Sequence, residues 1–316
     1  RIFREMAIEK LRGVEIRNPV YYFTLHGGKF KYFSEFLSLK QSKFSYEPRP
    51  VIKDGKGTEF YEHDVFSTGH QELDNLIGGF KRGSFVLLEV LENVPFKFVI
   101  DATLPIVENF ILQGRGVITV PYGNINRSYL INIYSSLASK EAAKKYYKVI
   151  APCPLVIQTG HPYFCDMIDK CPRIINPGMK YRSEPTQYPV PVEHCMKSFP
   201  EILNKLVSIF KRETDQNVLF FLSFDKLETS LGPEYAEKVV MNIISRVRVG
   251  GDLCVGVTSP NLRINIKLKR MADYLFRVFS RGGTMFIYGV HPSTKIYNVN
   301  IDFSQAHPRL YFIPVV

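Results

Sequence analysis

Apolar residues recur every three or four positions in several segments of this chain, a pattern that predicts amphipathic helices. The predicted helices are 2–11, 99–113, 126–148 and 199–210, and we expect the second to be shortened or kinked at Pro105. The short run Val117–Val120 predicts a strand buried in a sheet.

A β-hairpin is predicted near the amino-terminal end, where the aromatic-rich runs 20–25 and 29–33 flank Gly27 and Gly28. Lys29 and Lys31 alternate with aromatic residues, and a basic aromatic ribbon can stack on bases or track phosphates. The two lysines are therefore candidate nucleic-acid contacts. The alternative, which we favour for the aromatic residues, is packing against the neighbouring domain. Residues 42–64 are polar and rich in Pro and Gly, so 1–64 is predicted as a helix, a hairpin and a linker arm.

Composition places the chain among ordinary water-soluble proteins. It has 316 residues, 45% of them hydrophobic and 22% charged, which fits one large domain with a small appendage. No run approaches the roughly 18 apolar residues needed to cross a bilayer, and no secretory signal is evident. Five cysteines, an odd number, suggest reduced thiols and a cytoplasmic location without membrane partners.

The net charge of +11 raises the question of an anionic partner, and the excess is concentrated late in the chain. From Ser245 to Val316 there are ten Lys and Arg residues against three acidic residues. A face that binds DNA or RNA is one interpretation, and a solvated basic surface is the other.

A proline-rich stretch around 149–198 is predicted as an insertion. It contains His161, Cys165, Cys171 and Cys195, which could supply the four N and S ligands of a tetrahedral zinc site. Their spacings match no common zinc motif, because no C-x-x-C pair is present. We therefore expect ordinary thiols rather than a metal here.

The stretch 67–97 is the most informative in the sequence. It contains Ser-Thr-Gly at 67–69, a short helix with Leu73, Asp74 and Leu76, a Gly78-Gly79 turn, and Arg82-Gly83-Ser84 before an apolar run. This order resembles the opening of a RecA/KaiC-type P-loop ATPase domain of the archaeal KaiC-domain type. The resemblance covers roughly 65–305 and implies an α/β fold, with a RecA-like, mostly parallel sheet flanked by helices. It implies strands at 85–90, 217–225 and 251–258, a helix ending near 248 and a closing hairpin at 285–288 and 296–301. Residues 65–316 would form this domain, preceded by a small α+β extension.

The family's glycine-rich phosphate loop is missing. Val90, Asn93 and Pro95 stand where glycines are expected, Phe96 where the phosphate-binding lysine is expected, and Lys97 where Ser or Thr is expected. Pro95 has no N–H to donate, and Val90 adds bulk where the backbone must approach the phosphates closely. Lys97, one position late, could still serve through a shifted loop.

A second catalytic element of the family is also replaced. The acidic pair that follows the second strand in the family becomes Pro121-Tyr122-Gly123. Asp225, at the end of 217–225, resembles the aspartate that holds magnesium. Without a phosphate cradle we expect Asp225 to hold a loop or cap the next helix, so Asp225 and Lys97 are vestigial site residues and no cofactor is expected.

Charged and apolar residues alternate in 261–270, so an extended chain would place its basic residues on one face. RecA-family proteins commonly carry DNA-binding loops near this point. The resemblance therefore makes Arg263, Lys267, Lys269 and Arg270 candidate phosphate contacts.

Three functions remain open. The first is a non-catalytic RecA/KaiC-like protein, a pseudo-ATPase that acts as a nucleic-acid-associated scaffold or regulator. The second is a protein-interaction partner of an active paralogue, or of a second copy, without nucleic acid. The third is an ATPase with a non-standard phosphate loop.

Overall fold

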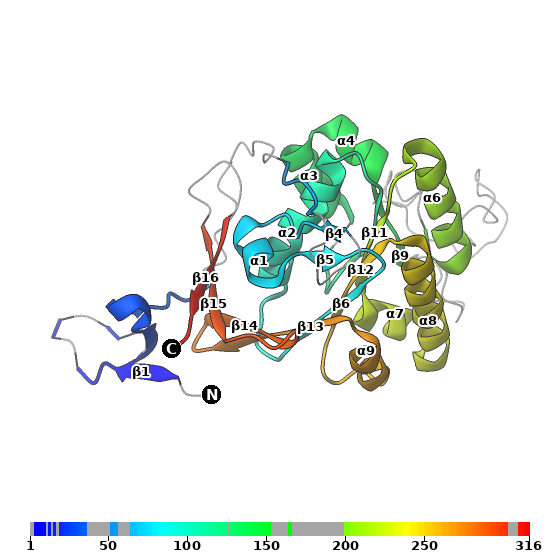
Figure 1. Ribbon diagram of the computed structural model, residues 1–316. Helices are drawn as coiled ribbons and strands as arrows, with labels where there is room; N and C mark the ends of the chain where they lie inside the picture. Colours follow the sequence, from blue (N-terminus) through cyan, green and yellow to red (C-terminus); the bar gives the residue numbers. More distant parts are fainter. Residues whose placement is uncertain are drawn as a thin grey trace, which may run out of the picture.

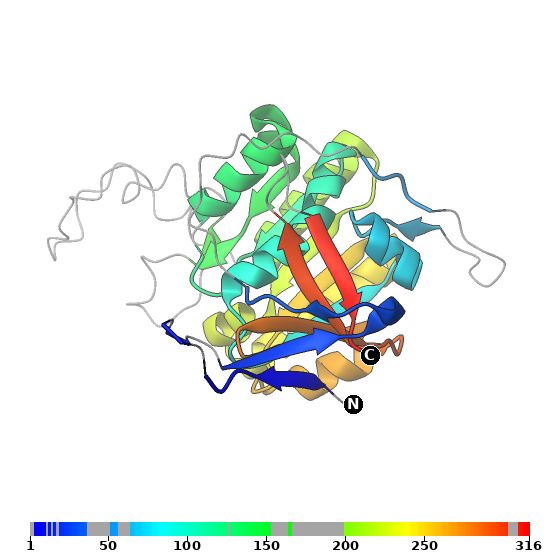
Figure 2. The same ribbon diagram turned by 90° about the vertical axis from the view of Figure 1, so that its left-hand side faces the viewer.

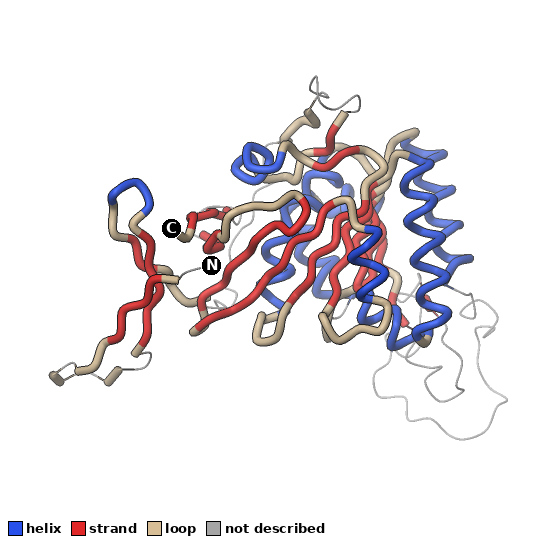
Figure 3. Tube along the Cα trace, turned by 60° about the horizontal axis from the view of Figure 1, so that its bottom comes forward, coloured by secondary structure: helices blue, strands red, loops and turns tan. Residues whose placement is uncertain are grey.

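The computed structural model of the chain describes residues 3–10, 12–13, 15–16, 19–36, 51–55, 64–125, 127–152, 164–165, 199–302 and 309–316. At its centre lies a nine-stranded sheet in the order β16-β15-β14-β13-β6-β12-β11-β7-β8 (Figures 1 and 3). Neighbouring strands from β13 to β8 are parallel, and β14, β15 and β16 continue the sheet antiparallel.

The strands of this sheet are short and mostly buried. They are β6 (Phe85–Val90), β7 (Val117–Val120), β8 (Tyr147–Val149), β11 (Leu219–Ser223), β12 (Leu253–Thr258), β13 (Tyr274–Arg281), β14 (Thr284–His291), β15 (Tyr297–Asp302) and β16 (Arg309–Pro314). Smaller two-stranded sheets pair β4 (Val65–Phe66) with β5 (Phe80–Lys81), and β9 (Ala151–Pro152) with β10 (Phe164–Cys165).

Helices cover both faces of the sheet (Figure 1). One side carries α2 (Phe96–Leu112), α3 (Arg127–Ala138) and α4 (Lys140–Tyr146), with α1 (Gln71–Ile77) towards the β16 edge. The other carries α6 (Phe199–Thr214), α7 (Phe224–Leu231), α8 (Pro233–Gly250) and α9 (Asn265–Met271).

Strand β6 shows why the sheet needs both layers. Phe85 and Leu87 point into the core on the α6–α8 side, while Val86, Leu88 and Val90 point into the core on the α2 side. All six residues of the strand are buried, as expected of a parallel strand between two helical layers. The predicted α/β class with a mostly parallel sheet is confirmed.

Two helix predictions need correction. Pro105 does not shorten α2, which continues past it to Leu112. The segment predicted as one helix from 126 to 148 is two helices, broken at Ser139, whose φ of +83° is incompatible with a continuous helix. The Ser139 hydroxyl then caps α4 by accepting a hydrogen bond from the N–H of Ala142 at 3.2 Å.

The amino-terminal extension is a three-stranded antiparallel sheet of β1 (Arg4–Ala7), β2 (Val20–Thr24) and β3 (Lys31–Tyr32), which lies across the β15–β16 end of the molecule (Figure 2). The predicted hairpin is confirmed, with the short 3-10 helix η1 (His26–Gly28) at its turn. The helix predicted for 2–11 is wrong. Residues 4–7 pair in register with 20–23, and this tertiary pairing overrides the local spacing of apolar residues.

Aromatic rings attach this extension to the main sheet. Phe33 is 1% exposed, and its ring lies 5.8 Å from that of Phe286 on β14. Tyr22 and Phe3 contact the same ring at 6.0 and 5.1 Å. The aromatic residues that face the domain are thus packed, as favoured, whereas Phe30 and Tyr32 remain 55% and 61% exposed. A domain boundary at residue 64 stays a prediction.

The edge strand β16 is covered rather than open. The N–H of Leu310 donates to Nε2 of His70 at 3.0 Å, and the N–H of Phe312 donates to Oε2 of Glu72 at 3.3 Å. The hydroxyl of Thr24 donates to the carbonyl of Pro314 at 2.9 Å. Side chains from the start of α1, the residue before it and the extension therefore occupy hydrogen-bonding groups that would otherwise template another strand.

We predict that Phe33→Ala releases the extension, because removing a fully buried phenylalanine ring costs about 3–5 kcal/mol. The measurement is amide hydrogen exchange in β1–β3, which should accelerate strongly. Phe30→Ala is the matched control, since that ring is largely exposed and its loss should change exchange little. Equal exchange in the two variants would contradict the docking described above.

Candidate functional site

The carboxyl ends of the parallel strands β6, β7, β11 and β12 meet at one edge of the sheet, where α/β proteins bind their ligands. Four segments follow these strands there: residues 91–95 after β6, Pro121-Tyr122-Gly123 after β7, Asp225 after β11 and Ser259 after β12. These segments form the candidate functional site.

The segment between β6 and α2 contains an asparagine and a proline at positions where a phosphate loop has glycines. Asn93 adopts φ +65°, the left-handed conformation that a glycine would take without strain. Pro95 precedes the first residue of α2, and the N–H of Phe98 donates to the Pro95 carbonyl at 2.9 Å. This end of α2 therefore lacks one N–H altogether and has another already engaged.

Phe96 approaches the neighbouring segment, and its side chain is 52% exposed. Its Cβ lies 3.4 Å from the position where a side chain at Gly123 would begin, so the two segments are in close contact. The side chain stands at the position where the resemblance expects the phosphate-binding lysine, and it carries no charge.

Lys97 is held within its own helix. Its Nζ lies 2.5 Å from Oδ2 of Asp101, one turn further along α2, and the Asp101 side chain is 3% exposed. Burial raises the pKa of Asp101, and the charge and hydrogen bond of Lys97 oppose that rise. Lys97 thus compensates a buried carboxylate.

Asp225 is hydrogen-bonded to Ser259, the residue that follows β12. Its carboxylate accepts hydrogen bonds from the backbone N–H of Ser259 at 3.1 Å and from the Ser259 hydroxyl at 2.5 Å. Burial raises its pKa, against the lowering effect of Ser259. Burial and the charge of Asp225 raise the pKa of Tyr122 to about 12. Asp225 therefore holds a loop, as expected, beside the tyrosine that replaces the acidic pair.

The first part of the 67–97 motif has a structural role. Asp74 accepts hydrogen bonds from the Ser67 hydroxyl at 2.5 Å and from the N–H of Thr68 at 2.7 Å. Gly69 has φ +74°, and a Cβ there would lie 2.1 Å from the carbonyl oxygen of Pro105. Only glycine fits this contact, which packs the motif against α2.

A buried ionic cluster around Glu89 was not predicted from the sequence. Glu89 is 1% exposed on β6 and accepts hydrogen bonds from Asn265 at 2.9 Å and Lys269 at 2.8 Å, and from the guanidinium of Arg277. Burial raises the pKa of Glu89, but the hydrogen bonds from Lys269, Asn265 and Arg277 more than offset it, so the pKa is lowered overall. The available signal was one glutamate inside the apolar run 85–90, which demands a cation wherever the strand is buried.

The basic segment 261–270 is not an extended comb. Its second half is the helix α9, because Ile264 and Leu268, four positions apart, are both buried against the sheet. The carboxylate of Glu228 accepts the backbone N–H groups of Arg263 and Ile264, each at 3.2 Å, and so satisfies donors that precede the helix.

Of the four predicted phosphate contacts in this segment, two form ion pairs within the protein and two are exposed. Lys269 is committed to Glu89, and Lys267 pairs with Glu237 on α8 at 2.6 Å. Arg263 and Arg270 are exposed, and the structure shows no ion pair for either within the described residues. Lys29 and Lys31 are also exposed, beside Phe30 and Tyr32. Nucleic-acid binding by any of these residues stays a prediction.

Most of the suggested zinc ligands lie outside the described residues. His161, Cys171 and Cys195 fall there, and Cys165 is described only as part of β10. Within the described part of the chain, no group of three His, Cys, Asp or Glu side chains could hold a metal ion. In the same residues, no helix has the length and apolar character needed to cross a membrane.

We predict that Lys269→Met lowers the free energy of unfolding by about 1–3 kcal/mol, because it removes a charged donor from a buried carboxylate. Lys267→Met is the matched control on the same helix. It should cost less than about 1 kcal/mol, because its ion pair with Glu237 is largely exposed. Urea unfolding at neutral pH measures both.

The pH dependence provides a second check on the same pair. The lowered pKa of Glu89 means that its ionised form contributes stability at neutral pH, and that this contribution is lost as the pH falls through the lowered pKa. The difference between Lys269→Met and the unaltered chain should therefore shrink in acid. A difference that stays constant with pH would exclude this role for Lys269.

Comparison with known proteins supports the fold and identifies a family. A KaiC-like protein of Pyrococcus horikoshii OT3 aligns with 79% of this chain and 99% of its own, with a TM-score of 0.50 and 13% sequence identity. This likeness confirms the RecA/KaiC-like fold and shows the fold alone.

The sequence relatives are more specific. Protein GvpD2 of Halobacterium salinarum is 27% identical over 324 residues, and Protein GvpD1 of the same organism is 24% identical over 351 residues. Both matches cover 99% of this chain but only 58% and 62% of those proteins, so the chain spans about three-fifths of their length. The family described as GvpD basic region 2 matches residues 61–316. Because that match covers most of the chain, the protein belongs to the GvpD basic region 2 family.

Proposed function

We propose that this chain is a non-catalytic regulatory member of the GvpD family, which keeps the RecA/KaiC fold as a scaffold. The observation that carries the proposal is the start of α2, where Pro95 and Phe96 occupy the place of a phosphate loop and the Cβ of Phe96 approaches Gly123 closely. A helix amino terminus binds phosphate through free N–H groups and adjacent cations. Here the proline supplies no N–H and the nearby lysine is paired with Asp101.

The residue that would hold magnesium supports the same proposal. Asp225 has its carboxylate engaged by the Ser259 hydroxyl and backbone N–H. Recruiting it to a hydrated metal would break these hydrogen bonds, each worth roughly 1.5–3 kcal/mol to a charged group. The alternative of an ATPase with a shifted loop requires both Lys97 and Asp225 to leave their present partners.

Family membership suggests the process. We propose that the chain takes part in regulating gas vesicle formation, in the cytoplasm, through contact with other macromolecules rather than through catalysis. The partner could be an active paralogue, a second copy or a nucleic acid, and the experiments below separate nucleotide and nucleic-acid binding from protein contact.

We predict that millimolar Mg-ATP leaves the melting temperature unchanged to within about 1 °C. A ligand present at 100 times its Kd would add roughly 2.7 kcal/mol and raise the melting temperature by several degrees. Thermal shift with Mg-ATP, against Mg²⁺ alone as the control, measures the effect. An upward shift of several degrees that Asp225→Asn abolishes would contradict the proposal and favour the alternative of an ATPase with a shifted loop.

A nucleic-acid-associated role is the second candidate, favoured by two exposed arginines, Arg263 just before α9 and Arg270 within it, and by the exposed aromatic and basic side chains of β3 and its turn. Arginine and lysine contacts to phosphate supply most non-specific affinity, and exposed aromatic rings can stack on unpaired bases. The net charge of +11 adds long-range attraction to a polyanion.

We predict that Arg263→Glu combined with Arg270→Glu abolishes binding to single- and double-stranded DNA without lowering the melting temperature. Lys269 stays intact because its substitution would disturb the Glu89 cluster. Binding of the unaltered chain should weaken steeply as salt rises. Lys140→Glu combined with Lys144→Glu on α4 is the control with the same charge change on exposed residues of the opposite helical layer. Absent or salt-independent binding would leave protein contact as the function.

A further inference from the structure

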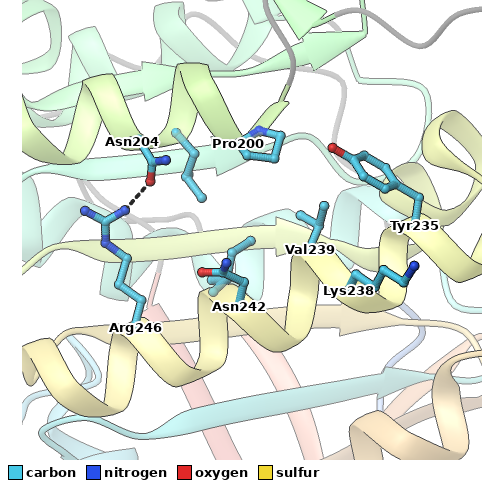
Figure 4. A pocket seen from close by; sticks show the side chains of 9 residues that line it. Pro200, Asn204, Tyr235, Lys238, Val239, Asn242 and Arg246 are labelled. Atoms are coloured by element: carbon cyan, nitrogen blue, oxygen red, sulfur yellow. Dashed lines mark hydrogen bonds between the residues drawn. The ribbon is translucent and has the colours of Figure 1, made fainter.

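A groove runs between α6 and α8 on the outer surface of their layer (Figure 4). Its floor consists of Leu203, Val239 and Ile243, whose inner sides belong to the core beneath. The cavity measures about 220 Å³, which is room for one large side chain rather than for a cofactor. The candidate functional site shares none of its described lining residues.

The rim of the groove is polar and carries one sign of charge. Lys238 and Arg246, both on α8, are its charged members, and no acidic side chain is among the described lining residues. They are eight residues apart, which corresponds to about 12 Å along a helix. Tyr235 stands at the end nearer Lys238 and is 45% exposed.

Arg246 is already oriented across the groove. Its guanidinium donates to Oδ1 of Asn204 on α6, so the side chain bridges the two helices as Figure 4 shows. A guanidinium has five N–H donors, and this contact uses one of them. The remaining donors can meet a carboxylate in bidentate fashion without reorganising the side chain.

We propose that this groove binds an amphipathic helix of a partner protein, which inserts one apolar side chain between α6 and α8 and presents two acidic residues, seven or eight positions apart, to Lys238 and Arg246. The spacing of the cations matches two turns of a helix laid along α8, and the apolar floor matches its anchor residue. The inference rests on the proposed regulatory function and names the class of its partner. Binding of ATP at the carboxyl edge of the sheet would contradict that function and leave the groove untouched.

A nucleic acid is a poorer match for the same surface. Phosphates would use the two cations but gain nothing from a floor of leucine, valine and isoleucine. A helix would use both the apolar floor and the two cations. Burying an apolar side chain contributes roughly 1.5–3 kcal/mol, and the acidic residues would fix the position of the helix along the groove.

The test uses a designed, fluorescently labelled helical peptide of about 20 residues, with a leucine anchor and two glutamates eight positions apart. Anisotropy should show saturable binding to the whole chain. Lys238→Glu combined with Arg246→Glu should weaken binding at least about tenfold, and a peptide with lysines in place of the glutamates should recover the affinity for that variant. Lys140→Glu on α4 is the charge control and should bind as the unaltered chain does.

Two further comparisons make the test sharp. A peptide whose glutamates lie four positions apart should bind more weakly, and Asn242→Trp, at an exposed rim position, should obstruct the groove without affecting the melting temperature. No saturable binding, affinity independent of the glutamate spacing, or failure of the lysine peptide to rescue the charge-reversed variant would each overturn the proposal. So would displacement of the peptide by a single-stranded oligonucleotide whose own binding the groove substitutions abolish, since the groove would then belong to nucleic acid.

Discussion

One buried carboxylate constrains the carboxyl-terminal half of this fold. Glu89 lies on the central strand, where helices cover both faces and water cannot solvate the charge. An ionised group in such a place needs cations and hydrogen-bond donors from the protein. Asn265 and Lys269 on α9 and Arg277 on β13 supply them, and each can do so only if α9 and β13 take their observed positions. The charge therefore fixes how the last helix sits against the sheet.

The charged groups of the candidate site are likewise paired within the protein. Two polar groups that a nucleotide and its magnesium would use have internal partners instead: Lys97 pairs with Asp101, and Asp225 with Ser259. The position of the phosphate-binding lysine is taken by Phe96, which is 52% exposed and whose Cβ lies 3.4 Å from the point where a side chain at Gly123 would begin. A site whose groups are already satisfied offers little free energy to a triphosphate. The function we propose uses this edge of the sheet as a scaffold and assigns binding to the outer helices and the amino-terminal sheet.

The sequence was sufficient where a pattern is local. The motif at 67–97, the β6 strand, the replacement of the acidic pair and the position of Asp225 after β11 are all legible in short windows, and the structure agrees with them. It was insufficient where distant residues decide. Residues 4–7 form a strand because 20–23 lie beside them, and α9 forms because Ile264 and Leu268 find the core while Glu228 satisfies the preceding N–H groups. The partners of Glu89 lie more than 170 residues away, so no window could assign them.

The contact between His70 and β16 has a consequence for the ring itself. A backbone N–H can only donate, so the Nε2 atom that faces Leu310 must offer a lone pair, and the imidazole there is neutral with its proton on Nδ1. A second proton on that ring would set two donors face to face. One of the hydrogen bonds that attach the last strand to the start of the first helix therefore depends on the tautomer of His70, whereas the bond from Phe312 to Glu72 does not.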